Sequence, residues 1–144
     1  MGIPSGWLLY ALLSAVFAAA TSILAKIGIK GVDSNLATAI RTVVITLFAW
    51  GIVLAQGTIK NVSHLNRTTW IFLILSGLAT GLSWLFYFRA LQLGEASKVV
   101  PIDKLSLVLA VIMAIVFLHE KLTVATTVGS LLITGGVLVM ALWK

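Results

Sequence analysis

Five long apolar stretches dominate the chain, and short polar segments separate them. The stretches cover residues 7–25, 36–55, 70–88, 99–118 and 122–143. Each is about 20 residues long, and a helix that rises about 1.5 Å per residue then crosses a hydrocarbon core about 30 Å thick. The pattern predicts an all-α polytopic membrane protein with five transmembrane helices.

The connections between these stretches leave no room for a second, soluble domain. They read "KIGIKGVDSN", "QGTIKNVSHLNRTT", "RALQLGEASK" and "HEK". We therefore expect a single five-helix transmembrane domain over residues 1–144. Nothing cationic except the amino terminus precedes Trp7, so the first stretch is interpreted as a retained helix and not as a cleaved signal peptide.

Composition agrees with a membrane location. Hydrophobic residues make up 60% of the 144 residues and charged residues only 10%, whereas soluble domains are about a quarter charged. The absence of cysteine excludes disulfides, thiolate metal sites and a cysteine nucleophile. The net charge of +6 comes from basic residues dispersed near the ends of the stretches. This pattern fits membrane topology better than nucleic-acid binding.

The distribution of lysine and arginine predicts an orientation. Five spans place the two termini on opposite sides of the membrane. The N-terminal side carries Lys60, Arg67 and Lys121; the other side carries Lys26, Lys30, Arg89, Lys98 and Lys144, with Arg41 and Lys104 close to it. By the positive-inside rule the N-terminus is expected outside and the C-terminus in the cytoplasm, across the cell membrane. A bias of three to seven leaves dual topology open.

Small and aromatic residues follow the stretches at helical spacing. The small residues favour close helix packing; they are Ala11, Ala15, Ala18, Ser22 and Ala25, then Ser76, Gly77, Thr80, Gly81 and Ser83, and then Thr126, Gly129, Ser130, Thr134 and Gly136. Trp7, Trp70 and Trp143 at span ends fit an interfacial aromatic belt. Trp84 and Tyr87 lie deeper, where they either pack or line a cavity.

Three of the four acidic residues have simple structural interpretations. Asp33 and Glu95 precede the second and fourth spans, where an acidic side chain can cap the helix. Glu120 lies with His119 and Lys121 in the fourth connection, as an interfacial charge cluster. Neither histidine has a partner at metal-ligand spacing, so no metal site and no cofactor are expected.

Asp103 is different because it lies inside the fourth span, about 6 Å from its start at Val99. One interpretation is an anchor, in which Lys104 snorkels and Asp103 pairs with Lys104, Arg41 or Lys26. The other is a binding site for substrate or a proton, with Ser106 on the same face.

Pro101 and Arg41 leave further alternatives open. A proline in the first turn costs little; if the helix begins near Ala96, however, Pro101 leaves a carbonyl unpaired and bends the helix beside the charges. Arg41, inside the second span, either snorkels, pairs with Asp103 or meets an anionic substrate. The cationic surplus near that face would suit an anionic metabolite, although the positive-inside rule predicts the same surplus.

Residues 84–123, "WLFYFRALQLGEASKVVPIDKLSLVLAVIMAIVFLHEKLT", resemble the signature region of the EamA domain of the drug/metabolite transporter superfamily. The region begins with an aromatic-rich helix that ends in an "A-L" pair. A short loop with a small residue and Ser follows, then a helix that begins with Pro, and finally an "L-x-E-[KR]-L-T" turn. The matching positions are Tyr87, Ala90, Leu91, Ser97, Pro101, Ser106, Glu120, Lys121, Leu122 and Thr123. The "PIDKLS" form resembles the five-span bacterial and archaeal subgroup.

This resemblance implies one half of a 5+5 inverted-repeat transporter architecture. Usual members contain two five-span repeats and move metabolites or amphiphilic compounds across the cytoplasmic membrane. A full pathway then needs a homodimer, antiparallel if it reproduces the inverted repeat, or a second five-span half. The charge bias opposes an antiparallel dimer. The first-helix glutamate of the related four-span multidrug proteins has no counterpart here, so that coupling mechanism is not carried over.

The leading functional hypothesis is a secondary transporter whose substrate or proton binds near Asp103, Lys104 and Arg41. Its partners would be the lipid bilayer, a small-molecule substrate and a second five-helix half, with no nucleic acid. No enzyme constellation is present in the sequence, so the chain is not expected to be an enzyme. The alternative is a non-transporting membrane subunit that assembles with a larger partner.

Overall fold

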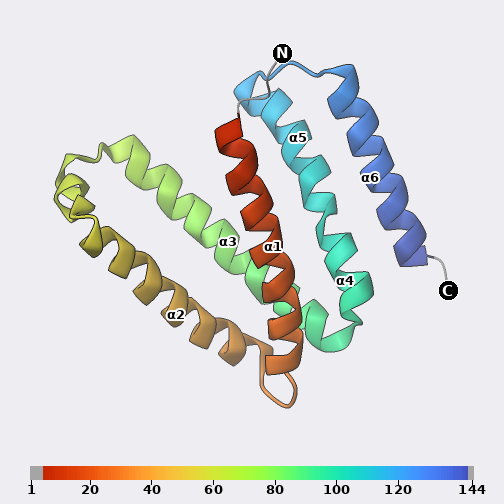
Figure 1. Cartoon of the computed structure of the whole chain (residues 1–144), viewed down its shortest axis with the longest axis horizontal. Helices are drawn as coiled ribbons and strands as arrows, with labels where there is room; N and C mark the ends of the chain where they lie inside the picture. Colours follow the sequence, from red (N-terminus) through yellow and green to blue (C-terminus); the bar gives the residue numbers. More distant parts are fainter. Residues whose placement is uncertain (1–4, 143–144) are drawn as a thin grey trace. The chain divides into compact units, whose positions relative to one another are not determined.

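The computed structural model describes residues 5–142, which form helices and no strands (Figure 1). The elements are α1 (Ser5–Gly28), α2 (Ser34–Ala55), the 3-10 helix η1 (Thr58–His64), α3 (Arg67–Leu93), α4 (Ala96–Asp103), α5 (Leu105–Leu118) and α6 (Val124–Leu142). Five segments are long and apolar enough to cross a membrane, with α4 and α5 together forming the fourth. The predicted all-α fold with five spans is confirmed. Trp143 and Lys144, which the sequence assigned to the fifth span and its cytoplasmic end, lie outside the described residues.

The helix ends differ from the predicted span ends. Helix α3 continues to Leu93 instead of ending at Phe88, and α6 begins at Val124 instead of Leu122. Hydropathy marks the part of a helix that matches the lipid, whereas the hydrogen-bonded helix continues into polar residues such as Arg89. The third connection therefore shrinks to two residues, 94 and 95.

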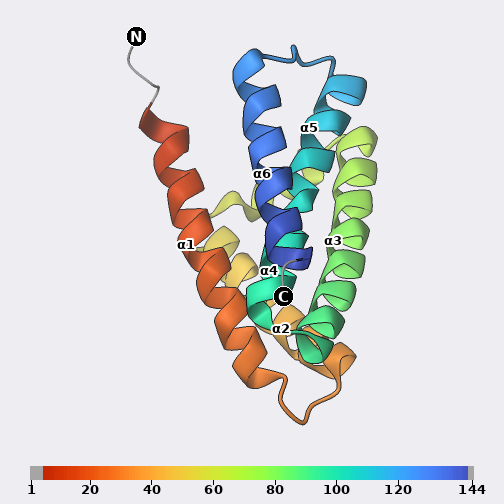
Figure 2. The same cartoon turned by 90° about the vertical axis from the view of Figure 1, so that its right-hand side faces the viewer.

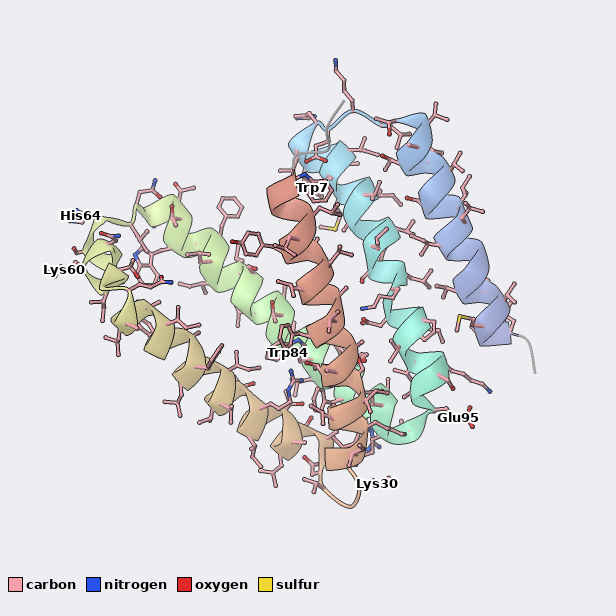
Figure 3. All side chains as sticks on the ribbon, in the orientation of Figure 1. Trp7, Lys30, Lys60, His64, Trp84 and Glu95 are labelled. Carbon is pink, nitrogen blue, oxygen red and sulfur yellow. The ribbon has the colours of Figure 1, made fainter. Side chains whose placement is uncertain are left out.

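The contacts divide the chain into two compact units, one of which is Leu24–Leu93. In this unit α2 and α3 form a hairpin whose turn contains η1 (Figure 1). Lys60 lies on η1 at the turn, and Lys30 lies before the start of α2, at the opposite end of the hairpin (Figure 3). The placement of these two lysines at opposite ends agrees with their predicted location on opposite sides of the membrane.

The core of this unit lies beside the turn between α1 and α2. Leu91 and Phe88 of α3 are 0% and 1% exposed, and Ile29 after α1 is 3% exposed. Asp33 caps α2 as predicted, because its Oδ1 accepts hydrogen bonds from the backbone N–H groups of Asn35 and Leu36 at 2.9 and 3.0 Å. The cap and the small core together fix the start of α2 against the end of α3.

Two long-range hydrogen bonds secure the same end of the hairpin. The Lys26 ammonium donates to the carbonyl of Leu91, and the Gln92 side-chain amide donates to the carbonyl of Val32 at 2.8 Å. Arg89 in turn donates to Gln92 Oε1 at 2.7 Å. Polar residues beyond the predicted third span thus hold the α1–α2 turn to α3, which explains why that helix extends past its apolar part.

The other unit contains residues 1–23 and 94–144, and α6 packs beside α4 and α5 (Figure 2). The connection from α5 to α6 runs from His119 to Thr123 and is longer than the predicted "HEK". His119 adopts a left-handed conformation with φ 55°, and the Glu120 N–H donates to the Ala114 carbonyl at 3.3 Å. The Thr123 hydroxyl accepts from the Thr126 N–H at 3.1 Å, as an N-cap does.

The glycine faces are not packed as we expected. A Cβ placed on Gly77, Gly81, Gly129 or Gly136 would meet no atom within 4 Å. In the spans of the described part most large apolar side chains are likewise exposed. Within each unit these glycines therefore make no tight contact, and whether their faces pack elsewhere in the bundle stays a prediction.

Candidate functional site

The most developed polar cluster of the α2–α3 unit surrounds Arg41. Its guanidinium carbon lies over the rings of Trp84 and Phe88, 4.9 and 4.8 Å from their centroids. Arg41 is the eighth residue of α2, about 10 Å from its first residue at 1.5 Å per residue. Trp84, labelled in Figure 3, and Phe88 are four residues apart on α3 and therefore share one helix face. The structure brings together two predicted site residues, Arg41 and Trp84.

Phe88 belongs to this candidate cluster but was not predicted from the sequence. It was counted only as the end of an apolar stretch, yet it is 1% exposed and also serves as a platform for the cation. The available signal was its spacing of four residues from Trp84. Tyr87, a predicted candidate, lies beside the cluster with its ring 6.3 Å from that of Phe88, at an interplanar angle of 67°.

The electrostatic surroundings of Arg41 are aromatic and not acidic within its own unit. Asp33 is the only acidic residue in positions 24–93, and its carboxylate caps α2. A cation over an aromatic ring gains about 0.5–2 kcal/mol, which offsets part of the cost of placing a charge within a span. The pairing of Arg41 with Asp103 stays a prediction.

Hydroxyl groups near Arg41 serve α2 itself. Thr38 donates to the carbonyl of Ser34 and Thr42 donates to the carbonyl of Thr38, each at 2.8 Å. Since these hydroxyl protons are used within the helix, they add no donor to the Arg41 cluster. A shallow hollow of about 400 Å³ is lined by Ala39, Thr42, Val43, Thr46 and Leu47. At about 100° per residue its centre lies on the face of α2 opposite Arg41, so it is not part of the cluster.

The second candidate cluster is the break between α4 and α5. The fourth span begins at Ala96, so Pro101 lies inside a helix and not in a first turn. Proline has no N–H to donate to the Ser97 carbonyl. The helix ends at Asp103, and the Lys104 N–H donates to the Pro101 carbonyl at 3.0 Å, three residues back. The helix therefore begins near Ala96, as the second alternative assumed; that Pro101 bends the span beside the charges stays a prediction.

Asp103 and Lys104 pair with each other at this break. Lys104 Nζ lies 3.4 Å from Asp103 Oδ2, and the side chains are 53% and 35% exposed for Lys104 and Asp103 respectively. Adjacent residues of a regular helix do not face each other; here Lys104 forms the turn between the two helices. The pair is one of those that the anchoring interpretation allowed, and it does not exclude the binding interpretation, so both stay open.

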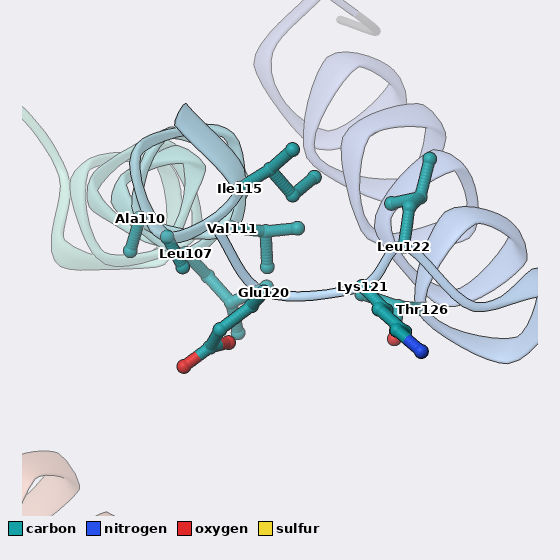
Figure 4. A pocket seen from close by; sticks show the side chains of 9 residues that line it. Leu107, Ala110, Val111, Ile115, Glu120, Lys121, Leu122 and Thr126 are labelled. Atoms are coloured by element: carbon teal, nitrogen blue, oxygen red, sulfur yellow. The ribbon is translucent and has the colours of Figure 1, made fainter. Parts of the chain in front are cut away.

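A cleft of about 320 Å³ lies between α5 and α6 in the same unit (Figure 4). Val111 and Ile115 line one side, Leu122 and Thr126 line the other, and the connecting segment carries Glu120 and Lys121. Ala110 also lines the cleft, whereas Asp103 and Ser106 are not among its lining residues. Ser106 is exposed. The predicted interfacial charges therefore border a mostly apolar cleft, separate from the helix break.

Glu95 does not cap α4, contrary to expectation. It occupies the N-cap position, but its side chain makes no capping hydrogen bond. Its Oε2 instead lies 3.8 Å from Lys98 Nζ. The exposed ion pair with Lys98 competes for the carboxylate, so the capping interpretation of Glu95 is wrong.

Comparison with known proteins assigns the family. Residues 5–142 match the EamA-like transporter family. The chain belongs to this family. The predicted resemblance is confirmed, and the match extends over both units and all five candidate spans. Together, the family and the five apolar helices indicate a multi-pass membrane protein with a role in transport.

Two relatives extend this assignment. A protein from a Sinorhizobium species, named as an uncharacterized transporter in the cobO 3′ region, is 49% identical over 137 residues, which cover 95% of this chain and 97% of that protein. An uncharacterized protein of Methanocaldococcus jannaschii is 29% identical over 105 residues, covering 67% of this chain and 77% of that protein. No solved structure matches the chain.

Proposed function

We propose that the chain is a secondary transporter that moves small metabolites or amphiphilic compounds across the cytoplasmic membrane. Membership of the EamA-like transporter family over residues 5–142 supports this proposal. The Sinorhizobium relative is itself named as a transporter. Transport needs no covalent chemistry of the protein, which agrees with the lack of a catalytic constellation in the sequence.

The observation that carries the proposal is the interruption of the fourth span at Pro101–Lys104. The carboxylate of Asp103 and the ammonium of Lys104 lie where α4 ends and α5 begins, inside the fourth candidate span. Discontinuous helices often hold the substrate and coupling-ion sites of transporters, because their free backbone groups and charges can bind a ligand within the membrane. We assign Asp103 the role of binding substrate or a proton, with Lys104 as its counter-ion between cycles.

The working unit we propose is a dimer of five-helix halves. The Sinorhizobium relative is aligned over 97% of its length, so a protein named as a transporter has the length of one five-helix half. A central pathway between two repeats requires both halves. The open glycine surfaces on α3 and α6 would allow close approach of another helix.

Uptake by vesicles that contain only the purified full chain tests this function. We expect saturable uptake or exchange of at least one compound from a panel of anionic, neutral and cationic metabolites. Asp103→Asn should abolish this activity, whereas Glu95→Gln, which removes the other ion-paired carboxylate of this unit, should not. Absence of flux for the whole panel, together with stable copurification of an unrelated membrane protein, would instead favour a non-transporting subunit.

A further inference from the structure

The hydrogen-bonding edge of Arg41 is unoccupied within its unit. Residues 24–93 are all described, and in them no hydrogen bond or ion pair is made by the Arg41 guanidinium, whose contacts are with the rings of Trp84 and Phe88. The guanidinium carbon lies over both rings, and neither ring offers an oxygen acceptor to its N–H groups. The five N–H donors of a guanidinium lie in that plane and point outward. The paired N–H donors along this edge, called the guanidinium fork below, match the two oxygens of a carboxylate or phosphate and therefore remain available for a ligand.

Charge balance makes an anion the expected ligand of this fork. Residues 24–93 contain six Lys and Arg residues against one acidic residue, Asp33, which caps α2. Arg41 differs from the other five because it lies within an apolar span and away from its ends. An unpaired cation there is costly, and an anionic ligand would lower that cost where water is scarce.

Space for the rest of a ligand lies along α3 next to Trp84. Gly81 and Gly77 precede Trp84 by three and seven residues, so the three share one face of the helix. A Cβ at either glycine would meet no atom within 4 Å. The Thr80 hydroxyl beside them is bonded to the Ser76 carbonyl at 2.9 Å. Within its unit this strip of α3 is thus open.

We propose that Arg41, held by Trp84 and Phe88, binds the single oxyanion group of an amphiphilic organic anion. The apolar body of this ligand lies along the face formed by Gly77 and Gly81. This assignment rests on the proposed transport function in naming the ligand as the substrate. An anionic lipid headgroup offers the same oxyanion chemistry, and the experiment separates the two sources.

Equilibrium binding to the detergent-purified full chain is the first test. The probes share one phenylethyl body and carry a carboxylate, a sulfonate, a phosphate, a neutral amide or an ammonium group. At least one oxyanion probe should bind at least about tenfold more tightly than the amide, as charge-assisted bidentate pairing requires. The proposal is overturned if no oxyanion probe binds at millimolar concentration, or if the amide binds equally well.

Variants locate the site. Arg41→Gln should weaken binding of the oxyanion probe at least about tenfold, and Arg41→Lys, which keeps charge but loses the fork, should retain only part of the affinity. The matched control is Arg67→Gln, which removes an exposed arginine of the same unit and should leave affinity unchanged. Equal losses for Arg41→Gln and Arg67→Gln would indicate a general charge effect and would overturn the assignment.

A second pair of variants tests the position of the ligand body. Gly81→Leu fills the strip beside Trp84 and should weaken probe binding, whereas Gly135→Leu on α6, where a side chain also meets open space, should not. If Arg41→Gln does not fold, Gly81→Leu and Arg41→Lys still test the site. Unchanged affinity in both of them would contradict it.

The lipid source is tested in bilayers. In nanodiscs that also contain phosphatidylglycerol, affinity for the anionic probe should be only a few-fold weaker than in phosphatidylcholine nanodiscs, as the negative surface potential of the anionic lipid alone requires. Strong competition by phosphatidylglycerol, with copurified phosphatidylglycerol lost in Arg41→Gln, would make Arg41 a lipid site and overturn the substrate assignment. Failure of transport is a separate result. If binding depends on Arg41 but no flux is measured, the transport function alone is refuted. If flux is measured and Arg41→Gln leaves it unchanged, the Arg41 binding site alone is refuted.

Discussion

The centre of the Phe88 ring lies 4.8 Å from the guanidinium carbon of Arg41, and this contact joins α3 to α2 within a membrane span. Phe88 is 1% exposed, so the same ring fills the small core of the unit and faces a cation. The aromatic platform stabilises a charge that has no acidic partner in its unit. A core residue thereby helps to position the candidate site residue Arg41.

Loss of Phe88 should therefore destabilise the chain strongly. We expect Phe88→Ala to cost about 3–5 kcal/mol of unfolding free energy, the range for a buried aromatic residue. Phe86, two residues earlier, is 74% exposed, and Phe86→Ala should cost about 0.5 kcal/mol or less. Unfolding in mixed micelles, followed by far-ultraviolet circular dichroism, compares the two. Similar costs would show that the small core does not hold the α2–α3 unit together.

The two capping positions should respond differently to alanine. Asp33 accepts two backbone hydrogen bonds, so Asp33→Ala should destabilise by about 0.5–2 kcal/mol. Glu95 makes no capping bond, and its ion pair with Lys98 is exposed, so Glu95→Ala should change stability by less than about 0.5 kcal/mol. The same unfolding assay measures both. An equal or larger loss for Glu95→Ala would contradict the described cap geometry.

Pro101→Ala should join α4 and α5 into one continuous helix. Alanine restores the N–H that can bond to the Ser97 carbonyl, and alanine is about 3 kcal/mol more favourable than proline within a helix. We expect higher thermal stability, slower amide exchange over residues 101–107 and reduced transport. Val100→Ala, a neighbouring change that leaves the proline in place, is the control. Unchanged exchange and full transport in Pro101→Ala would remove the break from the mechanism.

The predicted orientation can be measured with reporters. Fusions at each terminus should show the N-terminus outside and the C-terminus in the cytoplasm in most molecules, because the cationic bias is seven to three. Removing Lys26 and Lys30 should increase the inverted fraction, whereas removing Lys60 and Arg67 should decrease it. A single fixed orientation would exclude an antiparallel homodimer, and an inverted main population would show that the charge count was misinterpreted.

Much of the fold could be predicted because every helix that crosses the bilayer needs a run of about 20 mainly apolar residues, which is visible in the sequence. Helix ends were less predictable, since they depend on tertiary hydrogen bonds such as that from Gln92 to Val32. The sequence does not show whether Pro101 lies in the first turn of the fourth span or further inside the helix, because proline is compatible with both. The hydrogen bonds from the Lys98 and Val99 N–H groups to the Glu95 carbonyl show that the helix begins before Pro101.

The candidate site was only partly predictable for a related reason. The charges at Arg41, Asp103 and Lys104 stand out in apolar sequence, and Trp84 could be named as a deep aromatic. The spacing of Phe88 from Trp84 indicated a shared helix face, but the contact of Phe88 with Arg41 also depends on which face of α3 meets α2, and the sequence does not show this. The openness of the glycine faces was also hidden, since glycine serves both close packing and a free surface.

The most direct test of the central claim, transport by two five-helix copies, is flux through mixed dimers. Wild-type chain and Asp103→Asn chain are co-expressed in equal amounts, purified together and reconstituted, and initial uptake is compared with that of wild type alone at equal total protein. If both copies must be intact in one pathway, about a quarter of the activity remains. Activity near one half, or no flux in vesicles that contain only wild-type chain, would contradict the account.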